Sequence, residues 1–355
     1  MAQSGDESNS NRDRIEWLAE QIAYHSDLYY NQAKTEISDA EFDTLWDELK
    51  QLDPEHPQLQ RVGAEIDPGT VKVDHMFPMR SLNKGTNDDD ITHFVKESSL
   101  ESTRFISQPK LDGAALSLEY RKGRLVRGAT RGSGDRVEDV TKNARKVQNV
   151  PHTHGTEVDV HIRGEVVMRK SVFEEKYRDI SPNPRNLAAG ALRQKKSDGK
   201  GDASDLVFLA YDAKFPSKNN RHPDSQAPPS GLFDSHILEW LSNTAGVEPA
   251  PWVVHNSDTE EASIDSLCQE TRAWSASRST YDFEIDGLVF KVDDLEKRSL
   301  LGMTAHHPRW ALAWKFPPEE ATSVLLDVDW QTGRTGTITP VARIAPQRVG
   351  GVTVE

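Results

Sequence analysis

The spacing of apolar residues changes once along the chain, near residue 74, and this change constrains the fold more than any other feature. Before it, apolar residues recur at helical spacing in two stretches, Ile15, Leu18, Ile22 and then Phe42, Leu45, Leu49. After it, through about Pro318, short strand-like runs alternate with glycine-rich turns and occasional helices. The pattern predicts an α+β protein in which a small helical hairpin precedes an antiparallel-rich β domain.

The same pattern suggests four segments. Residues 1–11 are polar and rich in Ser, Asn and Asp, which predicts a disordered tail. We assign residues 12–68 to a helical cap and residues 69–318 to the main domain. Residues 319–355 alternate strand and turn signals and form a further β segment.

Composition narrows the class of protein. The 355-residue chain has no apolar run of membrane-spanning length and no signal-peptide pattern, so we expect a cytoplasmic protein that binds no membrane. Its single cysteine, Cys268, excludes an internal disulfide and a cysteine-cluster zinc site. A net charge of −14 argues against a wholly basic nucleic-acid coat, but Lys and Arg cluster within residues 121–146, as in a local polyanion site or a solvated face.

The segment QPKLDGAALSLEY, residues 108–120, contains a candidate nucleophile. Residues two apart on an extended chain point to the same side, so Lys110 and Asp112 can face one pocket. Gly113 permits a turn or a close approach to a ligand. The following run predicts a strand that turns at residues 121–124, so Lys110 is expected to start a hairpin.

Three further strand-like segments carry charged residues beside glycine or aromatic residues. HIRGEVVMRK contains Glu165, YDFEIDGLVFKVDD contains Asp286 and Lys291, and WALAWKFPPEE contains Lys315. Each alone is typical of an exposed strand residue. Together with Lys110 they indicate a cleft that handles phosphates.

Such a cleft suits nucleotidyl transfer to a lysine. A lysine is a nucleophile only when it has lost its proton, and nearby cations such as Lys291 and Lys315 favour that loss while holding phosphate oxygens. Arg131 can bind a phosphate or ribose group, and Glu165 can accept hydrogen bonds from ribose hydroxyls. Asp112 and Asp286 provide hard oxygen atoms for Mg²⁺, with Asp286 the candidate ligand.

The ordered motifs resemble the lysine-adenylating core of bacterial-type NAD-dependent DNA ligases. The resemblance covers nearly all of residues 12–355 and rests on KLDG (110–113), RGEVVM (163–168), EIDGLVFKV (284–292), WALAWKFP (310–317), HMFPMRSLNKG (75–85), SPNPRNLAAGALRQ (181–194) and the YYNQAKTEISDAEFD and QTGRTGTITPVARI stretches. It implies a helical NMN-binding cap, an ATP-grasp-like nucleotidyltransferase domain and the start of an OB-fold barrel.

The resemblance also implies a reaction. Lys110 would attack the α-phosphate of NAD, release nicotinamide mononucleotide (NMN) and pass AMP to the 5′-phosphate of nicked double-stranded DNA, for strand joining in replication and repair. Mg²⁺, or Mn²⁺, would assist, no zinc would be bound in this chain, and we expect a monomer.

The family's site positions carry over residue by residue. The catalytic set implied is Lys110, Asp112, Lys291 and Lys315. Those implied to bind the nucleotide are Ser81, Leu82, Gln108, Gly113, Arg131, Glu165, Arg185, Arg193 and Arg278. Those implied to bind the NMN half are Tyr29, Tyr30, Asp39 and Asp43.

Several positions depart from the family pattern. Gln108 stands where Glu is usual, Ser133 replaces an Asp, Val137 replaces a Gly, and Phe42 replaces a Tyr. Residues 319–355 match only the beginning of the OB-fold, and the family's zinc, helix-hairpin-helix and C-terminal modules have no counterpart.

Three alternatives therefore stay open. The chain is either a piece of a longer ligase or a naturally short relative. In either case we expect it to adenylate itself, and we do not assume that it seals nicks unaided. An ATP- or GTP-using relative, such as an RNA ligase or capping guanylyltransferase, shares the lysine chemistry. The third alternative is not an enzyme: a catalytically idle paralogue that binds nucleotide or DNA as an accessory module.

Overall fold

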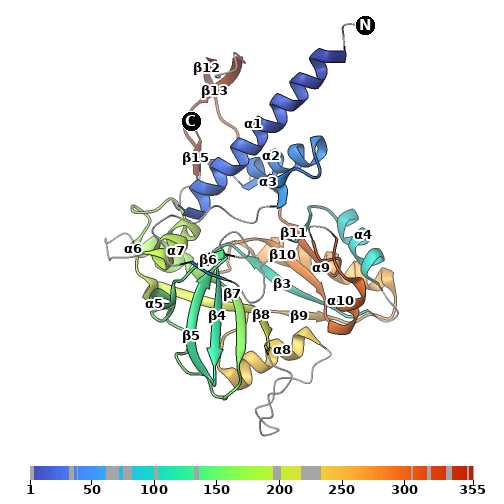
Figure 1. Ribbon diagram of the computed structural model, residues 1–355, viewed down its shortest axis with the longest axis vertical. Helices are drawn as coiled ribbons and strands as arrows, with labels where there is room; N and C mark the ends of the chain where they lie inside the picture. The colour runs from blue at the N-terminus through green and yellow to red at the C-terminus, as the bar shows by residue number, and fades with distance from the viewer. Residues whose placement is uncertain are drawn as a thin grey trace.

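The computed structural model describes residues 4–31, 36–37, 39–60, 72–74, 82–99, 103–131, 136–194, 201–216, 233–304, 307–317, 321–332, 338–349 and 352–354. Figure 1 shows the N-terminal helices and the C-terminal strands at one end of the molecule, and the large sheets with their flanking helices filling the rest.

The N-terminal segment is a helical hairpin, as predicted. It consists of α1 (Ser4–Asn31), α2 (Asp39–Leu52) and the short α3 (Pro57–Gln60). Leu18 and Ile22 of α1 pack against Leu49 of α2 and Leu59 of α3, and all four are buried. The predicted helical spacing therefore builds this small core.

The start of the hairpin differs from the prediction. Residues 4–11 are helical and not disordered, because a helix that is already nucleated extends into polar sequence at little cost per residue. Tyr29 and Tyr30 lie at the C-terminal end of α1.

The main domain contains two sheets. The five-stranded sheet has the order β2-β11-β10-β3-β9 and the four-stranded sheet the order β5-β4-β7-β8. The first comprises β2 (Asn83–Gly85), β3 (Phe105–Leu111), β9 (Val253–His255), β10 (Ile285–Val292) and β11 (Ala311–Lys315). The second comprises β4 (Ala114–Arg121), β5 (Arg124–Thr130), β7 (Val160–Met168) and β8 (Leu206–Lys214). Only the β2–β11 pair is parallel among these strands, so the predicted antiparallel-rich α+β class is confirmed.

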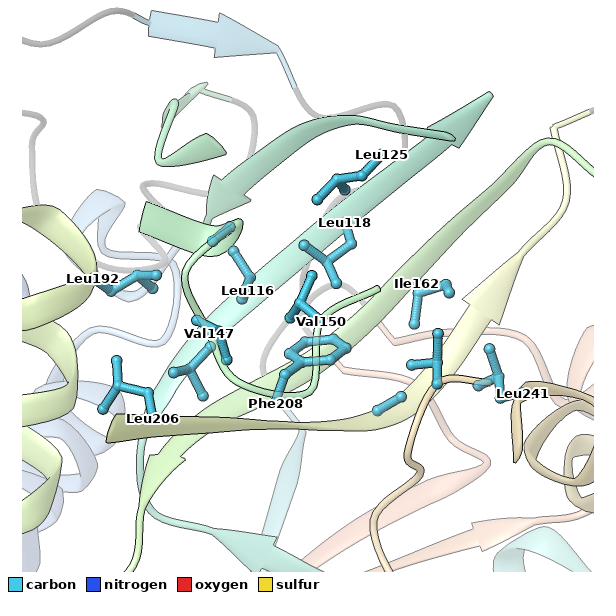
Figure 2. Close-up of a cluster of buried hydrophobic side chains, with 14 of the residues drawn as sticks. Leu116, Leu118, Leu125, Val147, Val150, Ile162, Leu192, Leu206, Phe208 and Leu241 are labelled. Carbon is cyan, nitrogen blue, oxygen red and sulfur yellow. The ribbon is translucent and has the colours of Figure 1, made fainter. Parts of the chain in front are cut away.

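Each sheet has its own apolar core. Figure 2 shows the larger one, where Leu116, Leu118, Ile162 and Phe208 pack together on one face of the four-stranded sheet. The helices that contribute to it are α5 (Thr141–Ala144), α6 (Lys170–Lys176), α7 (Pro184–Arg193) and α8 (Asp234–Trp240). On the five-stranded sheet the helices are α4 (Asp88–Ser98), α9 (Glu260–Ser277) and α10 (Leu295–Leu301).

The chain crosses from one sheet to the other at the KLDG segment. Lys110 is the penultimate residue of β3 in the five-stranded sheet, and β4 of the four-stranded sheet begins at Ala114. The prediction that Lys110 starts a hairpin was therefore wrong: Lys110 lies near the end of a strand, because the apolar run before it is itself a strand. A Cβ on Gly113 would lie 2.2 Å from the carbonyl oxygen of Val166, so only glycine fits this crossing.

The predicted β4–β5 hairpin is present. Arg121 pairs with Arg124, which leaves a two-residue turn of Lys122 and Gly123. Both have positive φ, 47° and 72°, as a hairpin turn that follows the strand twist requires.

The remaining strands form three two-stranded sheets. β1 (Lys72–Asp74) pairs with β6 (Arg136–Glu138), β12 (Leu325–Thr332) with β13 (Ile338–Ile344), and β14 (Gln347–Val349) with β15 (Val352–Val354). The assignment of residues 319–355 to an OB-fold, and the four segment boundaries, stay predictions. Among the described helices, none has the length and apolar character needed to cross a membrane.

Candidate active site

Two lysines flank one glycine across three neighbouring strands. Gly287 of β10 is paired with Lys110 of β3 on one side and with Lys315 of β11 on the other. Paired residues of adjacent strands point to the same face, so both lysines rise from one surface of the five-stranded sheet. A Cβ on Gly287 would lie 1.9 Å from the carbonyl oxygen of Trp314, so no side chain fits between the lysines.

Asp286 links these lysines electrostatically. The strand pairing is irregular between Ile285 and Gly287, and the Oδ2 atom of Asp286 lies 2.5 Å from Nζ of Lys110. Burial would raise the pKa of Asp286, but the positive charges of Lys110 and Lys315 outweigh it and hold the pKa below its usual value. Asp286 is therefore an ionised group that orients Lys110.

Glu165 approaches the same lysine from the other sheet. It lies on β7, partly buried, and burial raises its pKa to about 8, although the charges of Lys110 and Arg131 oppose the shift. The backbone N–H of Gly113 also contributes a hydrogen bond to this carboxyl group. At neutral pH Glu165 is thus mostly protonated, and its hydroxyl can donate as well as accept hydrogen bonds.

Asp112 and Arg185 complete this side of the cleft. Nη1 of Arg185, on α7, lies 2.6 Å from Oδ1 of Asp112. Burial lowers the pKa of Arg185 to about 10, and Asp286 opposes the shift. Asp112 therefore faces the same cluster as Lys110, as the Lys-x-Asp spacing predicts.

The cap contacts the cleft through Asp43. Its Oδ2 atom lies 2.6 Å from Nζ of Lys315, and its Oδ1 atom pairs with Lys84 of β2. One carboxylate of α2 thus bridges lysines on two neighbouring strands of the five-stranded sheet. This brings the predicted NMN-binding patch and the predicted nucleotide site together.

Lys291 lies in a second, more deeply buried cluster. Its Nζ atom is 2.5 Å from Oδ2 of Asp234 and 3.2 Å from the carbonyl oxygen of Tyr211. Arg298 lies 2.8 Å from the same Asp234 oxygen. Burial lowers the pKa of Lys291, and Asp234 opposes the shift. Lys291 is thus held by a protein carboxylate, and its expected contact with phosphate stays a prediction.

Three other expected residues have clear positions. Arg193, at the end of α7, lies 2.6 Å from Glu138. Arg278 follows α9 and stacks on Phe316, next to Lys315, at 5.0 Å. Leu82 precedes β2 and is partly buried. Ser81 and the side chains of Tyr29, Tyr30 and Asp39 lie outside the described residues, as does Ser133.

Sequence reasoning missed several residues of the cluster. Tyr211 of β8 lies near Glu165 and Arg131, whose charges act on its hydroxyl, and burial raises its pKa. Lys84 belongs to the HMFPMRSLNKG motif, which could have pointed to it. No local sequence pattern identifies Asp234 as a site residue, because the residues that it contacts are distant in sequence.

Asp286 and Asp112 are the carboxylates of this cluster that could hold the predicted Mg²⁺. Oδ1 of Asp286 is buried and has no hydrogen-bond partner in the described part of the chain, so one hard oxygen is available. Asp112 is a second carboxylate of this cluster: it pairs with Arg185, whose pKa the charge of Asp286 also affects. Within the described ranges no group of three His, Cys, Asp or Glu residues forms a cage, and Mg²⁺ needs none when substrate phosphates provide ligands.

Comparison with known proteins shows what this chain is similar to. Residues 69–319 match the NAD-dependent DNA ligase adenylation domain, and residues 8–64 match the DNA ligase-like, N-terminal NAD⁺-binding domain. A DNA ligase of Aquifex aeolicus is 36% identical over 95% of this chain and 48% of its own length. A DNA ligase of Rhodopseudomonas palustris is 38% identical, with the same two coverages of 95% and 48%. Among solved structures, a putative ATP-dependent DNA ligase from Aquifex aeolicus aligns with a TM-score of 0.37 and 13% identity, over 73% of this chain and 55% of that one.

The two family models that match define the class of this chain as a ligase-type adenylation module. The chain belongs to the NAD-dependent DNA ligase family, to which its adenylation domain and its N-terminal domain both match. It spans about half the length of the curated relatives that it matches.

Proposed function

We propose that this chain performs the adenylation step of an NAD-dependent DNA ligase. Nζ of Lys110 attacks the α-phosphate of NAD, a P–N bond forms, the P–O bond to NMN breaks, and NMN leaves with the electron pair. The observation that carries the proposal is the position of Lys110, which is partly exposed at the crossing between two sheets and paired with Asp286.

The surrounding residues have separate tasks in this step. Lysine must lose its proton before it attacks, and Asp286 holds the amine in place while Lys315 and Arg185 add positive charge around it. Those cations also favour the charge that develops on the phosphate oxygens. Protonated Glu165 is suited to hydrogen bonding with ribose hydroxyls. Mg²⁺, held by Asp286 and Asp112, would neutralise phosphate charge.

The cap supplies the preference for NAD. Asp43 reaches Lys315 from α2, so the predicted NMN-binding helix is within reach of the leaving group. Lysyl-AMP would then pass AMP to the 5′-phosphate of a DNA nick, and the 3′-hydroxyl would displace AMP and seal the strand. We place self-adenylation first because its candidate residues lie within this chain.

Intact mass spectrometry tests the proposal. The purified chain is incubated with Mg²⁺ and NAD, or with Mg²⁺ and ATP, beside the Lys110→Ala variant. Lys96→Ala, a change of an exposed lysine on α4, is the matched control. We expect a gain of one AMP from NAD in wild type and in Lys96→Ala, and none in Lys110→Ala.

The other outcomes are equally informative. A gain from ATP but not from NAD would assign the chain to the ATP-using relatives. No gain from either nucleotide would favour an accessory role in binding nucleotide or DNA.

A further inference from the structure

A third lysine, Lys84, lies on the same face of the five-stranded sheet as Lys110 and Lys315. Lys84 of β2 is paired with Ala313 of β11, and Ala313 precedes Lys315 by two residues. Residues two apart on a strand point to the same face of the sheet. Gly287 lies on β10, the strand that separates Lys110 from Lys315. The order across this face is therefore Lys110, Gly287, Lys315 and Lys84.

One carboxylate contacts Lys84 and Lys315 together. Oδ1 of Asp43 pairs with Nζ of Lys84, and Oδ2 of Asp43 lies 2.6 Å from Nζ of Lys315. The two ammonium groups are therefore close enough to contact two oxygen atoms of one anion. An ammonium group has three N–H donors, and the side chain of Lys84 is 36% exposed. Lys84 can thus donate to Asp43 and to an anionic ligand at the same time.

Transfer of a phosphoryl-type group imposes a direction on the substrate. The attacking and leaving atoms lie roughly in line, on opposite sides of the phosphorus. Neighbouring strands are about 4.8 Å apart, and Lys110 and Lys315 are two strands apart, so an α-phosphate would have room over Gly287 between them. Attack by Lys110 from the side of β3 would direct the leaving group toward β11 and β2, where Lys84 lies.

We propose that Lys84 binds the phosphate of the NMN leaving group and stabilises the negative charge that this phosphate gains. This inference rests on the proposed adenylation function. As Nζ of Lys110 forms the P–N bond, the P–O bond to NMN breaks and its electron pair stays on the NMN oxygen. The proton released from the amine passes to solvent. Lys84 keeps its own proton and donates a hydrogen bond to the NMN phosphate.

This role determines which steps depend on Lys84. NMN is present when lysyl-AMP forms, and again when added NMN reverses the reaction and regenerates NAD. Both directions pass through the same transition state, so both need the charge of Lys84. Binding of AMP alone does not place a phosphate on the leaving-group side of the site. It should therefore not depend on Lys84.

Three variants separate the charge of Lys84 from its packing. Lys84→Met removes the charge and keeps an unbranched side chain, and Lys84→Arg keeps the charge. Lys96→Met makes the same change at an exposed lysine of α4 and is the matched control. Intact mass measures the rate of adduct formation over a range of NAD concentrations. It also measures the rate at which the isolated lysyl-AMP form loses AMP when NMN is added.

We expect Lys84→Met to lower kcat at least about tenfold in both directions, since it removes a donor from the place where charge develops. Lys84→Arg should stay within about fivefold of wild type, because it still donates charged hydrogen bonds to phosphate. Lys96→Met should behave as wild type. An unchanged kcat in Lys84→Met, with normal adduct formation by wild type, would overturn the inference and leave the adenylation function intact.

Binding provides a readout that does not depend on catalysis. NMN and nicotinamide riboside differ only in the phosphate, and stabilisation against heat reports the affinity of the folded chain for each. NMN should stabilise wild type and Lys96→Met more than nicotinamide riboside does. Lys84→Met should lose most of this difference and keep its stabilisation by AMP.

Two results of the binding experiment would refute the role of Lys84. One is a full difference between NMN and nicotinamide riboside in Lys84→Met, and the other is no difference between them in wild type. If wild type forms no adduct from NAD, the adenylation function fails, and the comparison of NMN with nicotinamide riboside still decides whether Lys84 binds this phosphate.

Discussion

The raised pKa of Glu165 makes a quantitative prediction about stability. Burial raises this pKa from 4.5 to about 8 in the folded chain. Between these pH values the folded state keeps a proton that the unfolded state releases, so the free energy of unfolding falls as pH rises. At 1.36 kcal/mol per unit of pKa, the total loss approaches about 5 kcal/mol between pH 4.5 and 8 and levels off above pH 8.

The Glu165→Gln variant isolates this contribution. Glutamine has the same shape but no proton to lose, so the variant should gain stability relative to wild type as pH rises from 5 to 9. Urea unfolding at intervals of pH, followed by tryptophan fluorescence and circular dichroism, measures the difference. Glu174→Gln, at an exposed position on α6, controls for the change in net charge.

The result that refutes the reasoning is a constant difference. If wild type and Glu165→Gln show parallel stability over pH 5 to 9, the carboxyl group has an ordinary pKa. Burial would then be offset by Lys110 and Arg131, and Glu165 would be ionised when nucleotide binds.

Three further substitutions test the architecture around the cleft. Gly287→Ala should destabilise the fold by about 3 kcal/mol or more in urea unfolding, because the added Cβ meets the Trp314 carbonyl. The control Gly246→Ala should cost only about 1 to 2 kcal/mol, because Gly246 has open space around it and only its left-handed backbone, with φ of 68°, opposes a side chain. Asp234→Asn should cost about 3 to 5 kcal/mol, since it leaves Lys291 and Arg298 buried without their counter-charge; a loss below 1 kcal/mol in thermal unfolding would show that water reaches this cluster. Asp43→Asn should raise KM for NAD severalfold. The melting temperature should change little, because the ion pairs of Asp43 are partly exposed. The control Glu48→Gln, which breaks the Arg14 pair between α1 and α2, should leave KM unchanged.

The sequence predicted elements well where a local pattern determines them. The spacing of Leu18, Ile22 and Leu49 predicts the helical hairpin because each residue packs into one small core. The Lys122-Gly123 turn is also determined by neighbouring residues, so a local pattern predicts it. The start of α1 was predicted wrongly, because polar composition alone does not distinguish an extended helix from a disordered tail.

Contacts within the site depend on pairs that are distant in sequence. Lys315 and Asp43 are 272 residues apart, and the ion pair between them requires the cap to lie over the five-stranded sheet. Neither residue has a local pattern that identifies its partner. The motifs thus indicated which residues belong to the cleft but not that Lys84 shares the Asp43 carboxylate.

Asp286 shows how one local irregularity determines the site. Leu288 and Phe290 pack into the core of the five-stranded sheet, and strict alternation would place Asp286 on that same apolar face. The irregular pairing between Ile285 and Gly287 lets Ile285 enter the core instead, so Asp286 is free to reach Lys110. A pattern of alternating residues cannot reveal such an insertion, because the same letters fit a regular strand. The acidic partner of Lys110 is therefore fixed by the bulge, and a substitution that restored regular pairing would place a carboxylate among apolar side chains.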